Sequence, residues 1–122
     1  MDRTFLWVGA LAGFVGVALG AFGAHGLRTR LSAEMLTVFE TGVRYQMYHA
    51  LAILIVALAA ARLDGWLIRF AGWLFTAGIV LFSGSLYALA LSGVTVLGAV
   101  TPLGGLAFLA GWAALVIASL RL

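Results

Sequence analysis

The side chains that could do chemistry lie in two short stretches of an otherwise apolar chain. A glycine-rich segment ends at His25, and a second group follows at Glu40, Arg44, Tyr45, Tyr48 and His49. Glu40 and Arg44 are four residues apart, the spacing at which a carboxylate and a guanidinium meet on one helix face. Because one connection joins the two stretches, we expect both to lie at the same surface of the fold.

A pair formed by Glu40 and Arg44 has two possible uses. It can tie a surface helix to the rest of the fold with nothing bound, because structural ion pairs are common. It can instead belong to a ligand or ion site, because ionisable groups at membrane depth are expensive and tend to be functional. The sequence favours the structural use and leaves the second one open.

His25, His49 and Glu40 together would offer three ligands that zinc or another divalent ion accepts. However, the spacing His-Glu-x-x-His does not occur, and a histidine after a helix end commonly bonds free backbone carbonyls. Ligation of a haem by both histidines would need them on opposing helices at matching depth. We therefore predict no metal and no cofactor, and we assign no catalytic residue.

Glycines recur through the segment before His25 at spacings of four, three, four and three residues. They are Gly9, Gly13, Gly16, Gly20 and Gly23. These spacings place all five on one helix face, where small residues let a second helix approach backbone to backbone. Packing within the chain is the expected use, and self-association through an outward face is the alternative.

The composition points to a membrane protein. Of 122 residues, 65% are hydrophobic and 9% are charged, which is outside the usual range for a soluble domain. Cysteine is absent, so disulfides and thiolate chemistry are excluded. The arginines are scattered among short connections, a distribution that suits anionic lipid headgroups and not nucleic acid.

Four segments are long enough to cross a hydrocarbon core of about 30 Å, which takes about 20 apolar residues per helix. They cover about 5–24, 45–61, 70–91 and 103–120. Ser32 predicts the start of a short amphipathic surface helix between the first two spans, or of a continuous second helix. The predicted fold is all-α, an integral membrane four-helix bundle forming a single domain, residues 1–122.

Four spans place both chain ends on one side of the membrane. That side would collect Arg3, Arg62, Arg69 and Arg121, whereas the other side has Arg28 and Arg30, with Arg44 at the membrane edge. The positive-inside rule then favours cytoplasmic termini. The polar cluster would face the outside of a bacterial inner membrane, or the equivalent face of an organelle membrane.

Three motifs resemble those of one family of small membrane proteins. They read Gly-Ala-Phe-Gly-Ala-His-Gly at 20–26, Glu-Thr-Gly-Val-Arg-Tyr-Gln-Met-Tyr-His-Ala at 40–50, and Thr-Pro-Leu-Gly-Gly at 101–105. The chain is similar over nearly its whole length to the domain of unknown function 423 family, which includes the eukaryotic transmembrane protein 256. The resemblance implies a small multi-span protein, in the bacterial inner membrane in most members, with no established activity.

Three main kinds of function remain, with one further alternative. The first is a structural or interaction role, in which the polar cluster docks lipids, a second copy or another membrane protein. The second is a small oligomeric transporter or channel, with a pore lined by Thr76, Ser83 and Ser85, and a lipid- or metal-binding role is a further alternative. The third is a membrane enzyme with a histidine base, which ranks last because no nucleophile has a matching partner.

Overall fold

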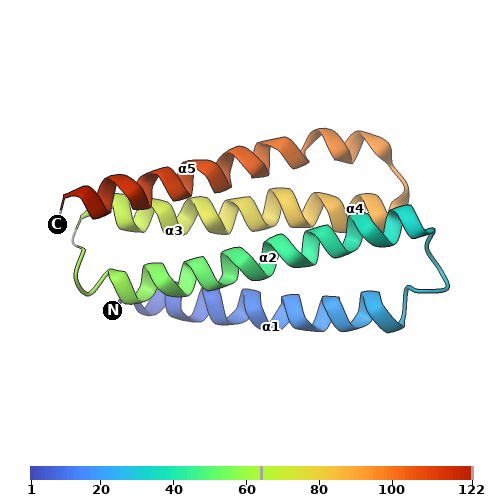
Figure 1. Cartoon of the computed structure of the whole chain (residues 1–122), viewed down its shortest axis with the longest axis horizontal. Helices are drawn as coiled ribbons and strands as arrows, with labels where there is room; N and C mark the ends of the chain where they lie inside the picture. Colours follow the sequence, from blue (N-terminus) through green and yellow to red (C-terminus); the bar gives the residue numbers. More distant parts are fainter. Residues whose placement is uncertain (64, 122) are drawn as a thin grey trace.

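The computed structural model describes residues 1–63 and 65–121, which form an all-α bundle with both chain ends at one end of it (Figure 1). The first two helices are α1 (Arg3–His25) and α2 (Ala33–Ala59). A third helical stretch runs through α3 (Trp66–Gly78), η1 (Ile79–Ser83) and α4 (Gly84–Ser92). The short η2 (Thr95–Ala99) and the long α5 (Thr101–Leu120) complete the chain.

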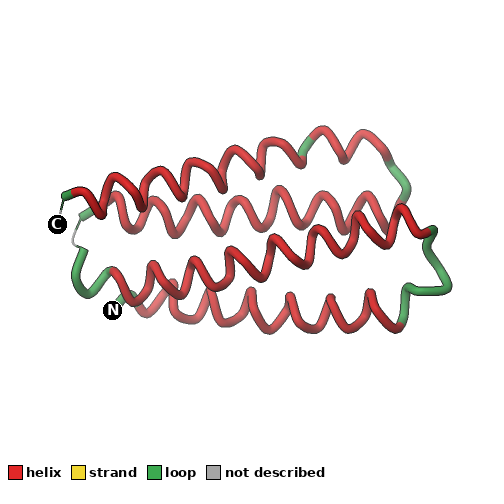
Figure 2. Tube along the Cα trace, in the orientation of Figure 1, coloured by secondary structure: helices red, strands yellow, loops and turns green. Residues whose placement is uncertain are grey.

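Within the described residues, four helical stretches are long and apolar enough to cross a membrane. They lie alongside one another and are joined by short loops (Figure 2). The helical bundle predicted from the sequence is therefore confirmed. Its third member includes one π-helical turn, η1, which is flanked by Gly78 and Gly84.

The short surface helix expected between the first two spans is not a separate element. Residues Ala33–Ala59 form one continuous helix, as the alternative of an extended second helix predicts. Its start is capped by Ser32, whose Oγ accepts a hydrogen bond from the backbone N–H of Met35 at 3.1 Å. The helix contains no proline, and its one glycine, Gly42, packs against Tyr87. Nothing in these residues breaks the helix.

The inner face of α1 contacts α2 through glycines. An added Cβ at Gly23 would lie 2.9 Å from the ring of Phe39, so a larger side chain would push the helices apart. Cβ atoms at three further positions would meet α2 side chains at 3.2 Å or less: Gly9, Gly16 and Gly20. Gly13 is different, because no side chain or neighbouring helix among the described residues lies within 4 Å of its Cβ position.

The contact between α5 and the third helical stretch is equally close. A Cβ at Gly104 would lie 2.7 Å from the Cα of Phe82, and one at Gly111 would lie 2.6 Å from the ring of Phe75. Phe75 is fully buried in the main apolar core, together with Phe5, Ile53 and Val56. The core thus combines small residues at helix crossings with aromatic rings between them.

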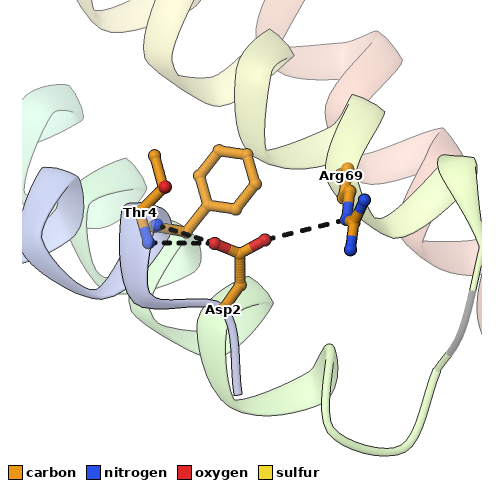
Figure 3. Close-up of polar contacts among 4 residues, drawn as sticks. Asp2, Thr4 and Arg69 are labelled. Carbon is orange, nitrogen blue, oxygen red and sulfur yellow. Dashed lines mark hydrogen bonds and ion pairs between the residues drawn. The ribbon is translucent and has the colours of Figure 1, made fainter.

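Asp2 fixes the start of α1 and brings three helix ends together (Figure 3). Its Oδ1 accepts hydrogen bonds from the backbone N–H groups of Thr4 at 3.0 Å and Phe5 at 3.4 Å. Its Oδ2 lies 3.8 Å from Nε of Arg69, and its N–H donates to the carbonyl of Ala57 at 3.0 Å. Because the Arg69 side chain is largely exposed, the cap contributes more stability here than the ion pair.

The backbone approach at Gly104 gives a direct test of this packing. We expect Gly104→Ala to lower the free energy of unfolding by about 1–3 kcal/mol, because its Cβ would meet the backbone of Phe82, which cannot rotate away. The neighbouring Gly105→Ala is the control, since its nearest contact is at 4.0 Å. The measurement is the unfolding midpoint in detergent. Equal midpoints for the two variants would contradict the close approach.

Candidate functional site

The residues of the predicted polar cluster on α2 lie on two different faces of that helix. Glu40, Arg44 and Tyr48 are exposed on the outside of the bundle. His49 is 5% exposed and points into the bundle interior, while Tyr45 lies at the edge between the two faces. The cluster that the sequence suggested is therefore divided between an inner group and an outer group.

His25 is distant from His49. Gly23 packs against Phe39, so in this antiparallel pair the last residue of α1 is level with about residue 37 of α2. His49 is twelve residues further along α2, or about 18 Å at 1.5 Å per residue. The expectation that both histidines lie at one surface is wrong, because His49 belongs to the middle of its helix. No group of three acidic, histidine or cysteine side chains suited to a metal occurs within residues 1–63 and 65–121.

Glu40 and Arg44 are not joined by an ion pair. In the described part of the chain, the ion pair found is that of Asp2 with Arg69. Both side chains instead point outward, in a helix whose length and composition suit a membrane span. Among the residues that the structure describes, neither charge therefore has an ion-pair partner.

His49 lies in an aromatic cage that fixes its imidazole. The ring stacks on Phe108 with 3.5 Å between centroids and 9° between planes. Its Nδ1 lies 2.7 Å from the carbonyl oxygen of Tyr45, and the indole N–H of Trp112 donates to its Nε2 at 3.1 Å. A carbonyl only accepts and an indole N–H only donates, so these partners assign the neutral ring with its proton on Nδ1.

Gln46 forms a second polar centre, one turn of α2 away from His49. Its amide nitrogen donates to the carbonyl of Ala12 in α1 at 2.9 Å, and its amide oxygen accepts from the hydroxyl of Tyr87 in α4 at 2.6 Å. In the same region, the buried Ser83 in η1 donates to the carbonyl of Gly42 at 2.6 Å. These bonds connect α2 to both of its neighbours.

Sequence reasoning missed Gln46, although a signal for it exists. The buried face of α2 repeats at alternating spacings of three and four residues: Phe39, Gly42, Gln46, His49, Ile53 and Val56. This is the pattern of one helix face turned toward a core. It places Gln46 and His49 inside and Glu40 and Arg44 outside, whereas selection by residue type alone put them together.

The buried polar side chains of the bundle interior are hydrogen-bonded. Within the described residues, every buried side-chain nitrogen and oxygen has a hydrogen-bond partner. The hydroxyls considered as pore-lining groups are engaged in the same way: Thr76 with the carbonyl of Gly72, Ser83 with that of Gly42, and Ser85 with Thr101. Ser83 and Ser85 therefore bond one helical stretch to another, and Thr76 bonds within α3.

Comparison with known proteins gives the family. The model for the family described as "Protein of unknown function (DUF423)" matches residues 19–105. The chain belongs to this family. Curated DUF423 relatives include the UPF0382 membrane protein YwdK of Bacillus subtilis, 48% identical over 98% of both chains. The Haemophilus influenzae UPF0382 membrane protein is 47% identical over 99% of this chain and 97% of its own.

These relatives, together with the four apolar helices, show that this DUF423 chain is a multi-pass membrane protein. The names of the relatives give no reaction, substrate or ligand. No solved structure gives a significant match to the fold. The function must therefore be argued from the geometry of this bundle.

The bond between Tyr87 and Gln46 can be tested by removing one oxygen. We expect Tyr87→Phe to lower the free energy of unfolding by about 1 kcal/mol, because it leaves the buried Gln46 oxygen without its donor. Tyr48→Phe removes the same atom from an exposed side chain and should leave stability unchanged. Detergent unfolding of both variants gives the comparison.

A double variant separates this bond from loss of ring packing. With Gln46→Leu in place, the further change Tyr87→Phe should cost less than it does alone, because the oxygen has already lost its partner. Equal costs in the two backgrounds would show that the hydroxyl and the amide do not interact.

Proposed function

We propose that this protein has a structural or interaction role in a bacterial inner membrane, and that it docks a membrane partner on the outer face of α2. The observation that carries this proposal is the outward position of Glu40 and Arg44 on a membrane-spanning helix. Charged side chains facing lipid are costly, and such residues are rare unless they serve a purpose. A partner on this face would remove them from lipid.

The depth of Arg44 supports the proposal. Since Gly20 packs against Val43, Arg44 is level with the last third of α1, where the sequence is apolar. It lies about 10 Å, or seven residues at 1.5 Å each, below the level at which α1 ends. Glu40 lies one helical turn nearer to that end. The pair therefore belongs to the spanning part of the bundle and not to a loop.

The interior of the bundle favours this role over transport or catalysis. Within the described residues its buried polar side chains already have hydrogen-bond partners, and His49 is packed among aromatic rings. An aqueous path would need free polar groups along a continuous opening. A catalytic base would need an available proton acceptor, whereas both nitrogens of His49 have partners.

The placement in the membrane belongs to the same proposal. We place both termini in the cytoplasm, since Arg3, Arg62, Arg69 and Arg121 lie toward the termini and Arg28 and Arg30 lie in the opposite loop. The whole chain then forms one transmembrane domain. The loop arginines would contact lipid headgroups at the outer surface.

In-membrane photo-crosslinking tests the docking face. A photoreactive amino acid placed at Leu51 on α2 is expected to capture a protein of defined mass in native membranes. The same amino acid placed at Val116 on α5 should give mainly lipid adducts. The two positions are matched controls because they are 55% and 57% exposed. The proposal would be contradicted if position 51 gave no protein adduct, or if positions 51 and 116 gave protein adducts in equal yield.

A further inference from the structure

We infer that the partner on this face is a second copy of the same chain, with the two α2 helices packed in parallel about a two-fold axis normal to the membrane. This inference rests on the proposed function, because it names the occupant of the same face. Three features of the face support it: the spacing of its exposed residues, the order of its charges, and an open groove beside it.

The outward residues of α2 follow a seven-residue repeat. One set is exposed and spaced by seven: Thr37, Arg44, Leu51 and Leu58. A second set follows each of the first three members by three residues: Glu40, which is exposed, and Met47 and Leu54, which are half-buried against Gly16 and Gly9 of α1. Such a repeat keeps one seam of a helix in contact with a partner helix along its whole length. Since α2 uses another face for its own core, packing within the chain does not account for the exposed set.

The charges on this face are complementary to themselves. A two-fold axis brings the same surface of both copies together, so that surface must match itself. Glu40 and Arg44 have opposite charges and lie one turn apart, about 6 Å along the helix. In a parallel pair, Arg44 of each copy would reach Glu40 of the other with its long side chain. Two ion pairs would form, and all four charges would leave lipid.

The same charges argue for a second copy over an anionic lipid. The spanning face carries one acid and one base and is therefore neutral overall. An anionic headgroup would gain from Arg44 but would be repelled by Glu40, only one turn away. A copy of the chain satisfies both side chains at once.

A groove beside the exposed repeat of α2 gives the partner helix a place to pack. It lies between α1 and α2, has a volume of about 480 Å³, and is lined mainly by apolar residues that include Gly13, Phe14, Met47 and Leu51. In the described part of the chain, no packing neighbour of α1 lies within 4 Å of the Cβ position of Gly13. Of the five glycines that recur along α1, Gly13 is the one that packing against α2 does not need. A helix from the second copy would use that space.

Charge reversal with mixing of variants tests this pairing. The protein is reconstituted in liposomes at low density, and its association is measured by energy transfer between labelled copies. We expect wild-type protein to dimerise and Glu40→Arg or Arg44→Glu alone to weaken association by at least about tenfold. Mixing the two variants should restore association, because one copy then carries two positive charges on the face and the other two negative charges.

Controls separate this effect from misfolding. Glu34→Arg makes the same charge change in the first turn of α2, outside the repeat, and should leave association unchanged. Gly13→Leu should weaken association by filling the groove, with the unfolding midpoint of the monomer unchanged. Each variant is checked by that midpoint first, since Glu40, Arg44 and Glu34 are all exposed and contribute nothing to the core.

Three outcomes would overturn the inference: wild-type protein that is monomeric at every density, single variants that associate normally, and mixed variants that fail to associate. The last would mean that the two charges do not meet across copies. If the wild type is monomeric while position 51 still captures a different protein, the second copy is excluded and the docking role stands. If position 51 captures no protein, the docking role itself fails.

Discussion

The amide of Gln46 is the interaction on which the arrangement of the helices depends. Its nitrogen bonds to α1 and its oxygen to α4, so one side chain connects three helical segments. In hydrocarbon there is no water to replace either bond, and each unpaired group would cost several kcal/mol. The depth and rotation of α1 and α4 relative to α2 are fixed by the requirement that both bonds form together.

Small residues make that arrangement possible. A Cβ at Gly16 would lie 2.5 Å from the sulfur of Met47, so glycine at this point lets α1 and α2 approach closely enough for the Gln46 amide to reach the backbone of α1. On the other side of the bundle, Gly104 and Gly111 let α5 approach close enough for Phe108 and Trp112 to enclose His49. The hydrogen bonds between helices and the close helix crossings at glycine therefore depend on each other, because the bonds form only where the helices approach closely.

The sequence predicts the fold well because spanning a membrane imposes a strict length and apolarity on each helix. The start of the second helix is harder to predict, since residues 33–44 combine polar and apolar side chains at helical spacing and are equally suited to a surface helix. The structure shows that their apolar side, including Phe39, packs inward, which extends α2 to Ala33. Whether these residues form a separate surface helix or the start of α2 depends on their packing against α1 and α4.

The candidate site was predicted less completely. Residue type identified Glu40, Arg44 and His49 but not which way each side chain points, because that depends on the neighbours of α2. Gln46 carries no charge and was not selected, although it makes the most extensive side-chain bonds between helices. Residue spacing along α2 separates inner from outer residues, and it is a better guide here than chemical class.

The order of the helices has a consequence for biosynthesis. The most extensive contacts are those of α1 with α2 and of α3 with α5, so the chain consists of two halves, and the first is synthesised before the second. When the first helical hairpin enters the bilayer, Gln46 and His49 still lack their partners on Tyr87 and Trp112. That unmet bonding favours association of the first hairpin with the second half as it arrives in the bilayer.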